Sequence, residues 1–203
     1  MATNYYTGES LSADGLNSDQ ECVLCGYNKL DLIRPYIRQR EIFLNSYVVQ
    51  CPKCLLMQIN PTPSRRGLID FYEKDYRAEG TVGYKEPKSS NRHRSQAKYM
   101  LENLKKIKLT PINVVDVCSG HGQLLLILKK ELPQAKLFAT ELDPRIIEGL
   151  SENQIFTKKI LVEDCERNPF DVQFDLLICS HVLEHAIYPK KFLKVLRSMM
   201  SPH

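Results

Sequence analysis

The fold is decided by the run Ile112-Asn113-Val114-Val115-Asp116-Val117-Cys118-Ser119-Gly120-His121-Gly122 and the leucine-rich run from Leu124 to Leu128 that follows it. The first half is short, apolar and β-branched, which is typical of a strand buried on both faces. It ends in a turn with two glycines, and a helical pattern begins directly afterwards. Such a unit directs backbone N–H groups and a positive helix end at whatever occupies the turn, as nucleotide and anion sites require.

The chain after Pro111 alternates between strand and helix patterns. We expect strands at 112–117, 136–140, near 159–162 and 174–179, and helices at about 123–132, after Asp143-Pro144 and at about 189–199. This alternation predicts the α/β class, with a Rossmann-like, doubly wound parallel sheet that binds ligands at the carboxyl ends of its strands. Upstream, 91–108 is predicted to be an amphipathic helix. Its basic residues favour a solvated face over contact with phosphate or RNA.

Composition indicates an ordinary globular protein. The chain has 203 residues, 43% of them hydrophobic, and a net charge of +4, which is too small to indicate nucleic acid by itself. Its longest apolar run, Leu124 to Leu128, is far short of the roughly 20 residues of a membrane span. Residues 1–19 contain no apolar core of a signal peptide. We therefore expect a cytoplasmic protein without a membrane partner.

Four of the seven cysteines form two Cys-x-x-Cys pairs, Cys22 with Cys25 and Cys51 with Cys54. Two such pairs can place four thiolates around one ion, so the spacing predicts a structural Zn²⁺ site with no open position for water. Unligated thiols and redox-active pairs are the alternatives. Zinc can contribute on the order of 10 kcal/mol to a module that is too small for a core of its own.

The composition divides the chain into four segments. We expect a disordered tail at 1–19, a zinc ribbon at 20–60, a linker or lid at 61–92 and the cofactor-binding domain at 93–203. Within the linker, Ser64 is predicted to cap a short helix that runs through Tyr72.

Acidic residues follow two of the expected strands. Glu141 closes the second strand, where a carboxylate can accept hydrogen bonds from both hydroxyls of a ribose. Glu163-Asp164-Cys165 follows the third strand, in a position to meet an adenine edge. A dinucleotide fingerprint would need a third glycine where this chain has Leu125, which disfavours an NAD site.

These motifs resemble those of class I S-adenosylmethionine-dependent methyltransferases. The resemblance rests on Asp116 to Gly122, on Glu141-Leu142-Asp143 and on the stretch from Phe174 to His185. The leading module, with Gln50 to Cys54 and the later Phe71 to Tyr76, resembles the zinc ribbon of bacterial sugar C-methyltransferases and their relatives. The resemblance covers roughly residues 20–200.

The resemblance implies that S-adenosylmethionine is the cofactor and that one set of residues binds it: Asp116, Ser119, Gly120, Gly122, Glu141, Leu142, Asp164, Cys165 and Ser180. It places the two glycines by the methionine moiety, Glu141 at the ribose, and Asp164 and Cys165 beside the adenine. Cys118 stands where such domains usually have glycine, so its side chain is expected to crowd the turn.

His181 and His185 are the candidate catalytic residues, because an imidazole can accept the proton that an acceptor releases on methylation. A structural role in the loop is the alternative. The pattern His-x-x-Glu-His also occurs in inverted zinc peptidases, but the segment follows a strand directly, as the methyltransferase fold requires.

The favoured function is methyl transfer from S-adenosylmethionine to a small molecule or a sugar-type acceptor. The alternatives are an rRNA or tRNA methyltransferase whose ribbon reads RNA, and an inactive, truncated methyltransferase-like module. The resemblance implies three further strands after residue 203, so we expect strands one to four of seven and an open apolar edge at 176–178. A second polypeptide that completes the sheet is therefore a possible partner.

Overall fold

The computed structural model describes residues 21–36, 43, 45–75 and 91–202. The expected tail at 1–19 and residues 76–90 of the expected lid lie outside the described residues. The chain divides into two compact units, Met1–Phe71 with Ile187–Lys190 and Tyr72–Ala186 with Lys191–His203. In the described ranges, no helix has both the length and the apolar character needed to cross a membrane.

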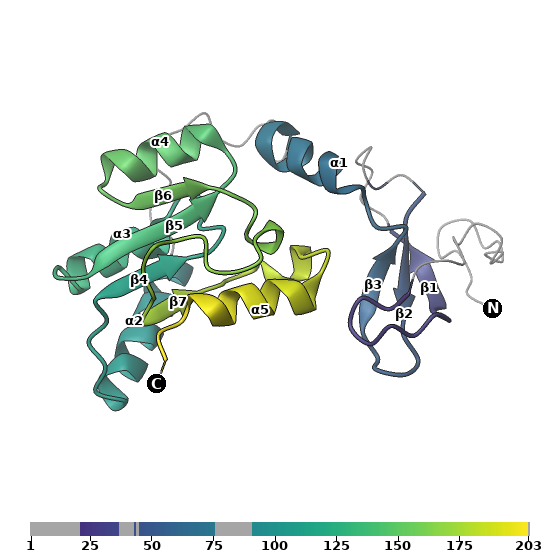
Figure 1. The fold of residues 1–203 in the computed structure, drawn as a ribbon, viewed down its shortest axis with the longest axis horizontal. Coiled ribbons are helices and arrows are strands. Elements are labelled where there is room, and N and C mark those ends of the chain that lie inside the picture. The colour runs from purple at the N-terminus through teal and green to yellow at the C-terminus, as the bar shows by residue number, and fades with distance from the viewer. Residues whose placement is uncertain (1–20, 37–42, 44, 76–90, 203) are drawn as a thin grey trace. The chain divides into compact units, whose positions relative to one another are not determined.

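The first unit contains an antiparallel sheet of three short strands, in the order β1 (Asp31–Pro35), β2 (Tyr47–Gln50) and β3 (Met57–Asn60) (Figure 1). Helix α1 (Arg65–Asp70) follows, and the Ser64 hydroxyl accepts a hydrogen bond of 3.1 Å from the N–H of Gly67. The predicted cap is therefore confirmed. The chain then continues into a π-helical turn, η3 (Phe71–Asp75), so helical structure extends beyond the predicted end.

The second unit is built on a parallel sheet of four strands, β4 (Asn113–Asp116), β5 (Lys136–Glu141), β6 (Phe156–Lys159) and β7 (Leu176–Ile178). Their order in the sheet is β6-β5-β4-β7 (Figure 1). The helices are α2 (Asn91–Lys106), α3 (Gln123–Glu131), α4 (Pro144–Glu152) and α5 (Pro189–Met199). The predicted α/β class and the Rossmann-like parallel sheet are confirmed.

Successive residues of the central strands enter two different apolar clusters, one on each face of the sheet. Val114 belongs to the cluster that α2, α3 and α4 supply, whereas Val115 belongs to the cluster that α5 supplies. The same alternation places Leu137 in the first cluster and Phe138 in the second. Because the side chains of a strand alternate in direction, this near-continuous apolar run fills both layers at once.

The third strand of the domain was predicted near 159–162, and this position is wrong. The strand β6 spans Phe156–Lys159, because Phe156 pairs with Phe138 of β5 and stacks on its ring at 5.2 Å. The apolar residues Leu161 and Val162 lie beyond the strand, in the turn at its carboxyl end. Their apolar character therefore reflects a cavity wall and the core, not pairing in the sheet.

The residues just before β7 are hydrogen-bonded to the last described residues of the chain. The N–H of Phe174 donates to the Met199 carbonyl at 2.9 Å, and the N–H of Ser201 donates to the Phe174 carbonyl at 2.9 Å. The Ser201 hydroxyl also bonds to the Asp175 carboxylate at 3.2 Å. These contacts hold the segment after α5 beside the start of β7.

Candidate functional site

A cavity of about 150 Å³ lies at the carboxyl ends of β4 and β5, in the second unit. Its walls are largely apolar, and their polar groups are a carboxylate, two imidazoles, a phenol and a thiol. The lining residues are Tyr72, Cys118, Glu141, Leu142, Leu161, Val162, His181, Val182, His185, Ala186 and Phe192. Four predicted site residues are therefore in its wall, namely Glu141, Leu142, His181 and His185.

Glu141 is buried at the end of β5 and holds the glycine turn in place. Its Oε2 accepts a hydrogen bond of 2.9 Å from the N–H of Gly120. Its Oε1 accepts from the N–H groups of Leu142 at 2.8 Å and Asp143 at 3.2 Å. Three backbone N–H groups therefore fix the orientation of this carboxylate at the turn.

The turn after β4 contains three residues in the left-handed region, Cys118 at φ 54°, Gly120 at φ 54° and Gly122 at φ 64°. A left-handed conformation costs a residue with a Cβ roughly 1–2 kcal/mol, so Cys118 is the strained member. Its N–H donates to the Thr140 hydroxyl at 2.9 Å, which ties the turn to β5. Cys118 also lines the cavity, and the crowding of the turn by its side chain stays a prediction.

Gly122 is the position where the turn tolerates no side chain. A Cβ added there would overlap the side chain of Leu150, a buried residue of α4. The next residue begins α3, so the glycine allows the turn and the helix to pack closely. Predicted Ser119 lies within the same turn, where its N–H donates to the Thr140 carbonyl at 3.1 Å.

Asp116 is the last residue of β4 and is buried beneath the turn. Burial raises the pKa of its carboxyl, and the negative charge of Glu141 raises it further, to about 8. The carboxyl is therefore protonated at neutral pH when nothing positive is nearby. A cation in the site would favour the ionised form and release this proton.

The other seven predicted cofactor-binding residues do not line the cavity; Asp116 and the turn residues Ser119, Gly120 and Gly122 are described above, and the remaining three are Asp164, Cys165 and Ser180. Asp164 ends the 3₁₀ turn η4 (Val162–Asp164), and Cys165 follows it, one turn beyond the Val162 wall. Ser180 follows β7, and its hydroxyl accepts a bond of 3.2 Å from the Gln96 amide of α2. Their assignment to the cofactor stays a prediction.

His181 and His185 lie on the loop after β7. His181 has a positive φ of 57°, and its Nδ1 is 3.4 Å from the Glu184 carboxylate. The Nδ1 of His185 is 3.0 Å from the hydroxyl of Tyr72, a residue of η3. Tyr72 was not predicted to have a role at the site. The only signal in the sequence was its place in the quoted stretch from Phe71 to Tyr76.

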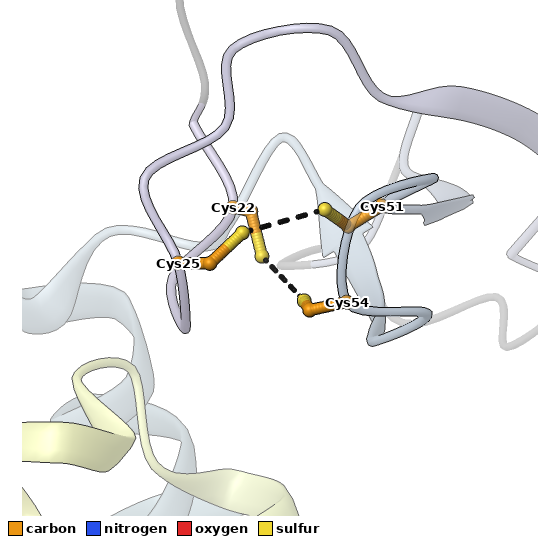
Figure 2. A group of neighbouring side chains, drawn as sticks. All are labelled: Cys22, Cys25, Cys51 and Cys54. Atoms are coloured by element: carbon orange, nitrogen blue, oxygen red, sulfur yellow. Dashed lines mark hydrogen bonds between the residues drawn. The ribbon is translucent and has the colours of Figure 1, made fainter.

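In the first unit, the sulfurs of Cys22, Cys25, Cys51 and Cys54 point toward one another (Figure 2). All four sulfur atoms lie within 4.8 Å of one another, with pairs at 3.5 Å. Tetrahedral zinc with bonds of about 2.3 Å would place its sulfur ligands roughly 3.8 Å apart. The cluster therefore fits a four-thiolate zinc site.

The two cysteine loops have the same backbone pattern. In each loop, the first cysteine donates its N–H to the carbonyl five residues later, in the pairs Cys22–Tyr27 at 2.8 Å and Cys51–Leu56 at 2.9 Å. The residue four positions after the cysteine is left-handed, Gly26 at φ 74° and Leu55 at φ 63°. This repetition is what two halves of one metal site require.

In the second cysteine loop, backbone N–H groups favour the thiolate form of Cys51, whereas burial and the neighbouring thiols raise the pKa of Cys54 to about 12. Burial raises the pKa of the Cys51 thiol, but the N–H groups of Cys54 and Lys53 and the neighbouring thiols lower it, to about 7. Metal ligation needs thiolates, so these donors are suited to a zinc knuckle.

Comparison with known proteins gives a family match within the second unit. Residues 115–203 match the family described as Methyltransferase domain. Among solved structures, the plantazolicin methyltransferase BpumL, in complex with a pentazolic desmethylPZN analog and SAH, superposes with a TM-score of 0.53. The sequence identity is 18%, over 67% of this chain and 54% of that one. This likeness confirms the methyltransferase-type fold.

Other solved methyltransferases are also similar. Magnesium protoporphyrin IX methyltransferase from Synechocystis PCC 6803 has a TM-score of 0.48 and 16% identity, over 67% of this chain and 71% of that one. Coclaurine N-methyltransferase has a TM-score of 0.48 and 14% identity, over 68% and 42%. The search of curated proteins gave no match. The chain spans about half the length of the BpumL structure.

Proposed function

We propose, from the match of residues 115–203 to the methyltransferase domain family, that the protein transfers a methyl group from S-adenosylmethionine to a small-molecule or sugar-type acceptor. In keeping with this proposal, the plantazolicin methyltransferase BpumL was solved in complex with a pentazolic desmethylPZN analog and SAH. The first unit then serves as a structural zinc ribbon.

The observation that carries this proposal is the hydrogen bond from the glycine turn to the carboxylate of Glu141. A dinucleotide cofactor needs the N–H groups of such a turn for its phosphates. Here the N–H of Gly120 already donates to Glu141, and among the described residues no lysine or arginine lines the cavity. A site with Glu141 in its wall and Asp116 below it is suited to a cationic cofactor instead.

The chain's own residues supply binding and orientation. Glu141 is placed to accept ribose hydroxyls, and the apolar walls exclude water from the acceptor. Methyl transfer from a sulfonium needs little covalent help, so positioning the two reactants supplies much of the rate. His185 and His181 are the candidate bases for the proton of the acceptor.

Titration calorimetry with S-adenosylmethionine tests the proposal. We expect the wild-type chain to bind, and Glu141→Ala to weaken binding by one to two orders of magnitude, because each charged hydrogen bond contributes roughly 1.5–3 kcal/mol. The matched control is Glu148→Ala, an exposed glutamate of α4, which should leave the affinity unchanged. No measurable binding by the folded wild type would refute the proposal for this chain.

A nucleic-acid acceptor is the second candidate, favoured by the exposed face of α2. The exposed basic residues of this helix are Arg92, Arg94, Lys98, Lys105 and Lys106. Tyr99 lies among them with 68% of its surface exposed, as in surfaces that stack bases. Fluorescence anisotropy with a labelled single-stranded RNA would test it. Salt-dependent binding that is lost in Lys105→Glu/Lys106→Glu would favour RNA, and its absence would leave the small-molecule acceptor.

A further inference from the structure

The turn η3 brings a side chain from outside the sheet into the wall of the cavity. Tyr72 and His185 both line it, and the Tyr72 hydroxyl is 3.0 Å from the His185 Nδ1. The two rings meet edge to face, at 6.0 Å and 80°. These residues are 113 positions apart, so the fold, not local sequence, creates the pair.

A second contact holds η3 at the carboxyl-terminal end of the parallel sheet. Glu73, next to Tyr72, forms an ion pair of 2.9 Å with Lys159, the last residue of β6. The Glu73 side chain is only 24% exposed, so this pair is better shielded than a typical surface pair. The tyrosine is therefore anchored by its neighbour as well as by its own hydrogen bond.

The tautomer of the imidazole decides which partner in this contact donates the hydrogen bond. A neutral imidazole has one N–H and one lone pair, and the hydrogen bond to one nitrogen decides which nitrogen is the base. Among the described residues, no hydrogen bond engages the Nε2 of His185. A histidine whose Nδ1–H donates to an oxygen keeps its Nε2 lone pair available, which is the tautomer that a general base needs.

We propose that Tyr72 is a positioning residue, which accepts a hydrogen bond from the Nδ1–H of His185 and so keeps Nε2 available as the base for a hydroxyl acceptor. This inference rests on the proposed methyl transfer. The acceptor oxygen forms a bond to the methyl carbon, and the bond from that carbon to sulfur breaks, its electron pair remaining on sulfur. The hydroxyl proton passes to Nε2, and the resulting imidazolium still donates from Nδ1 to Tyr72.

The test reads the tautomer of His185 directly. The full chain, labelled with ¹⁵N-histidine and kept at a pH where its imidazoles are neutral, would be studied by long-range ¹H–¹⁵N correlation, with His185→Gln providing the assignment. We expect the Nδ1–H pattern for His185 in the wild type and a shift toward Nε2–H in Tyr72→Phe, which keeps the ring. Tyr99→Phe, at an exposed tyrosine of α2, is the matched control and should change nothing.

An Nε2–H tautomer in the wild type, or an unchanged tautomer in Tyr72→Phe, would overturn the positioning role. Calorimetry on the same variants separates this failure from failure of the proposed function. Tyr99→Phe should bind S-adenosylmethionine as the wild type does, since Tyr99 is not among the residues that line the cavity. If the wild type binds no S-adenosylmethionine, the methyltransferase proposal fails, whatever the tautomer shows.

Discussion

Different interactions stabilise each of the two units. The sheet unit buries two apolar clusters, with residues such as Leu125 and Val115 completely covered. The cysteine unit has only short strands, and its most buried described side chains include two of its own cysteines, Cys22 and Cys51. A module with so small a core needs another source of stability, and the four converging thiols are suited to supply it by binding zinc. One unit is stabilised by packing, and we propose that the other is stabilised by a metal ion bound to its four cysteines.

Removing the metal should produce the largest difference between the units. We expect chelation, or Cys51→Ser, to unfold 21–60, because structural zinc contributes on the order of 10 kcal/mol to such modules. The sheet unit should stay folded. Hydrogen exchange read by mass spectrometry would show lost protection in ribbon peptides and retained protection in peptides from 113–199.

The control for metal removal is Cys165→Ser, a cysteine outside the cluster, which should keep one zinc per chain. Metal content is measured on the same samples by mass spectrometry. Equal loss of protection in both units after chelation would show that the sheet unit also depends on the ribbon.

A substitution at Gly122 should break the packed unit and spare the ribbon. Gly122→Ala combines a left-handed conformation with overlap on Leu150, so we expect a loss of about 2–4 kcal/mol in the free energy of unfolding of the sheet unit. Gly26→Ala provides the comparison in the ribbon, because its φ is also positive but its nearest neighbour is 3.7 Å away. Denaturant titration should give this variant the smaller loss, about 1–2 kcal/mol. Equal losses would mean that overlap with Leu150 contributes nothing.

The pH dependence of cofactor binding should be confined to the sheet unit. Asp116, with its pKa of about 8, is protonated below that pH, and a cationic cofactor must displace the proton. Affinity for S-adenosylmethionine should therefore rise with pH between 6 and 7.5, by up to about tenfold per pH unit. Calorimetry in buffers of different ionisation enthalpy would detect the released proton. Asp116→Asn should remove the slope, and a flat wild-type profile would contradict this explanation.

The smallest expected effect compares the two halves of the ribbon. Leu55 is left-handed and 68% exposed where the other loop has Gly26, so its side chain is strained without a packing benefit. We expect Leu55→Gly to tighten zinc binding by about twofold, since roughly 0.5 kcal/mol remains after the entropy of glycine is subtracted. Competition with a chromophoric chelator measures this. Leu24→Gly, at a position without a positive φ, should weaken binding, and a weakening in both variants would refute the assignment of strain.

Much of the fold could be predicted because its determinants are local. The apolar strands, the Ser64 cap and the paired cysteines each carry their signal within a few residues. The predicted position of β6 was wrong because Leu161 and Val162 look like strand residues. The pairing of Phe156 with Phe138 sets the actual register of the strand. Tertiary contact therefore overrode local propensity.

The candidate site was predicted less completely for the same reason. Glu141 could be identified because a carboxylate at the end of a parallel strand can accept hydrogen bonds from the hydroxyls of a ribose. Tyr72 was not, because its role depends on contact with a residue 113 positions away. The hydrogen bond from Gly120 to Glu141 was also not predictable, since the expected partner of that carboxylate was a ribose.

That hydrogen bond has a consequence for the speed of binding. Glu141 already orders the turn through the N–H groups of Gly120 and Leu142, so no loop has to fold when a cofactor arrives. An incoming molecule meets a turn that is already ordered, so it loses less affinity to the ordering of the site. We therefore expect association to be a single exponential phase in stopped-flow records, with a rate that grows in proportion to cofactor concentration. Glu141 would then keep the binding turn ordered between successive catalytic cycles.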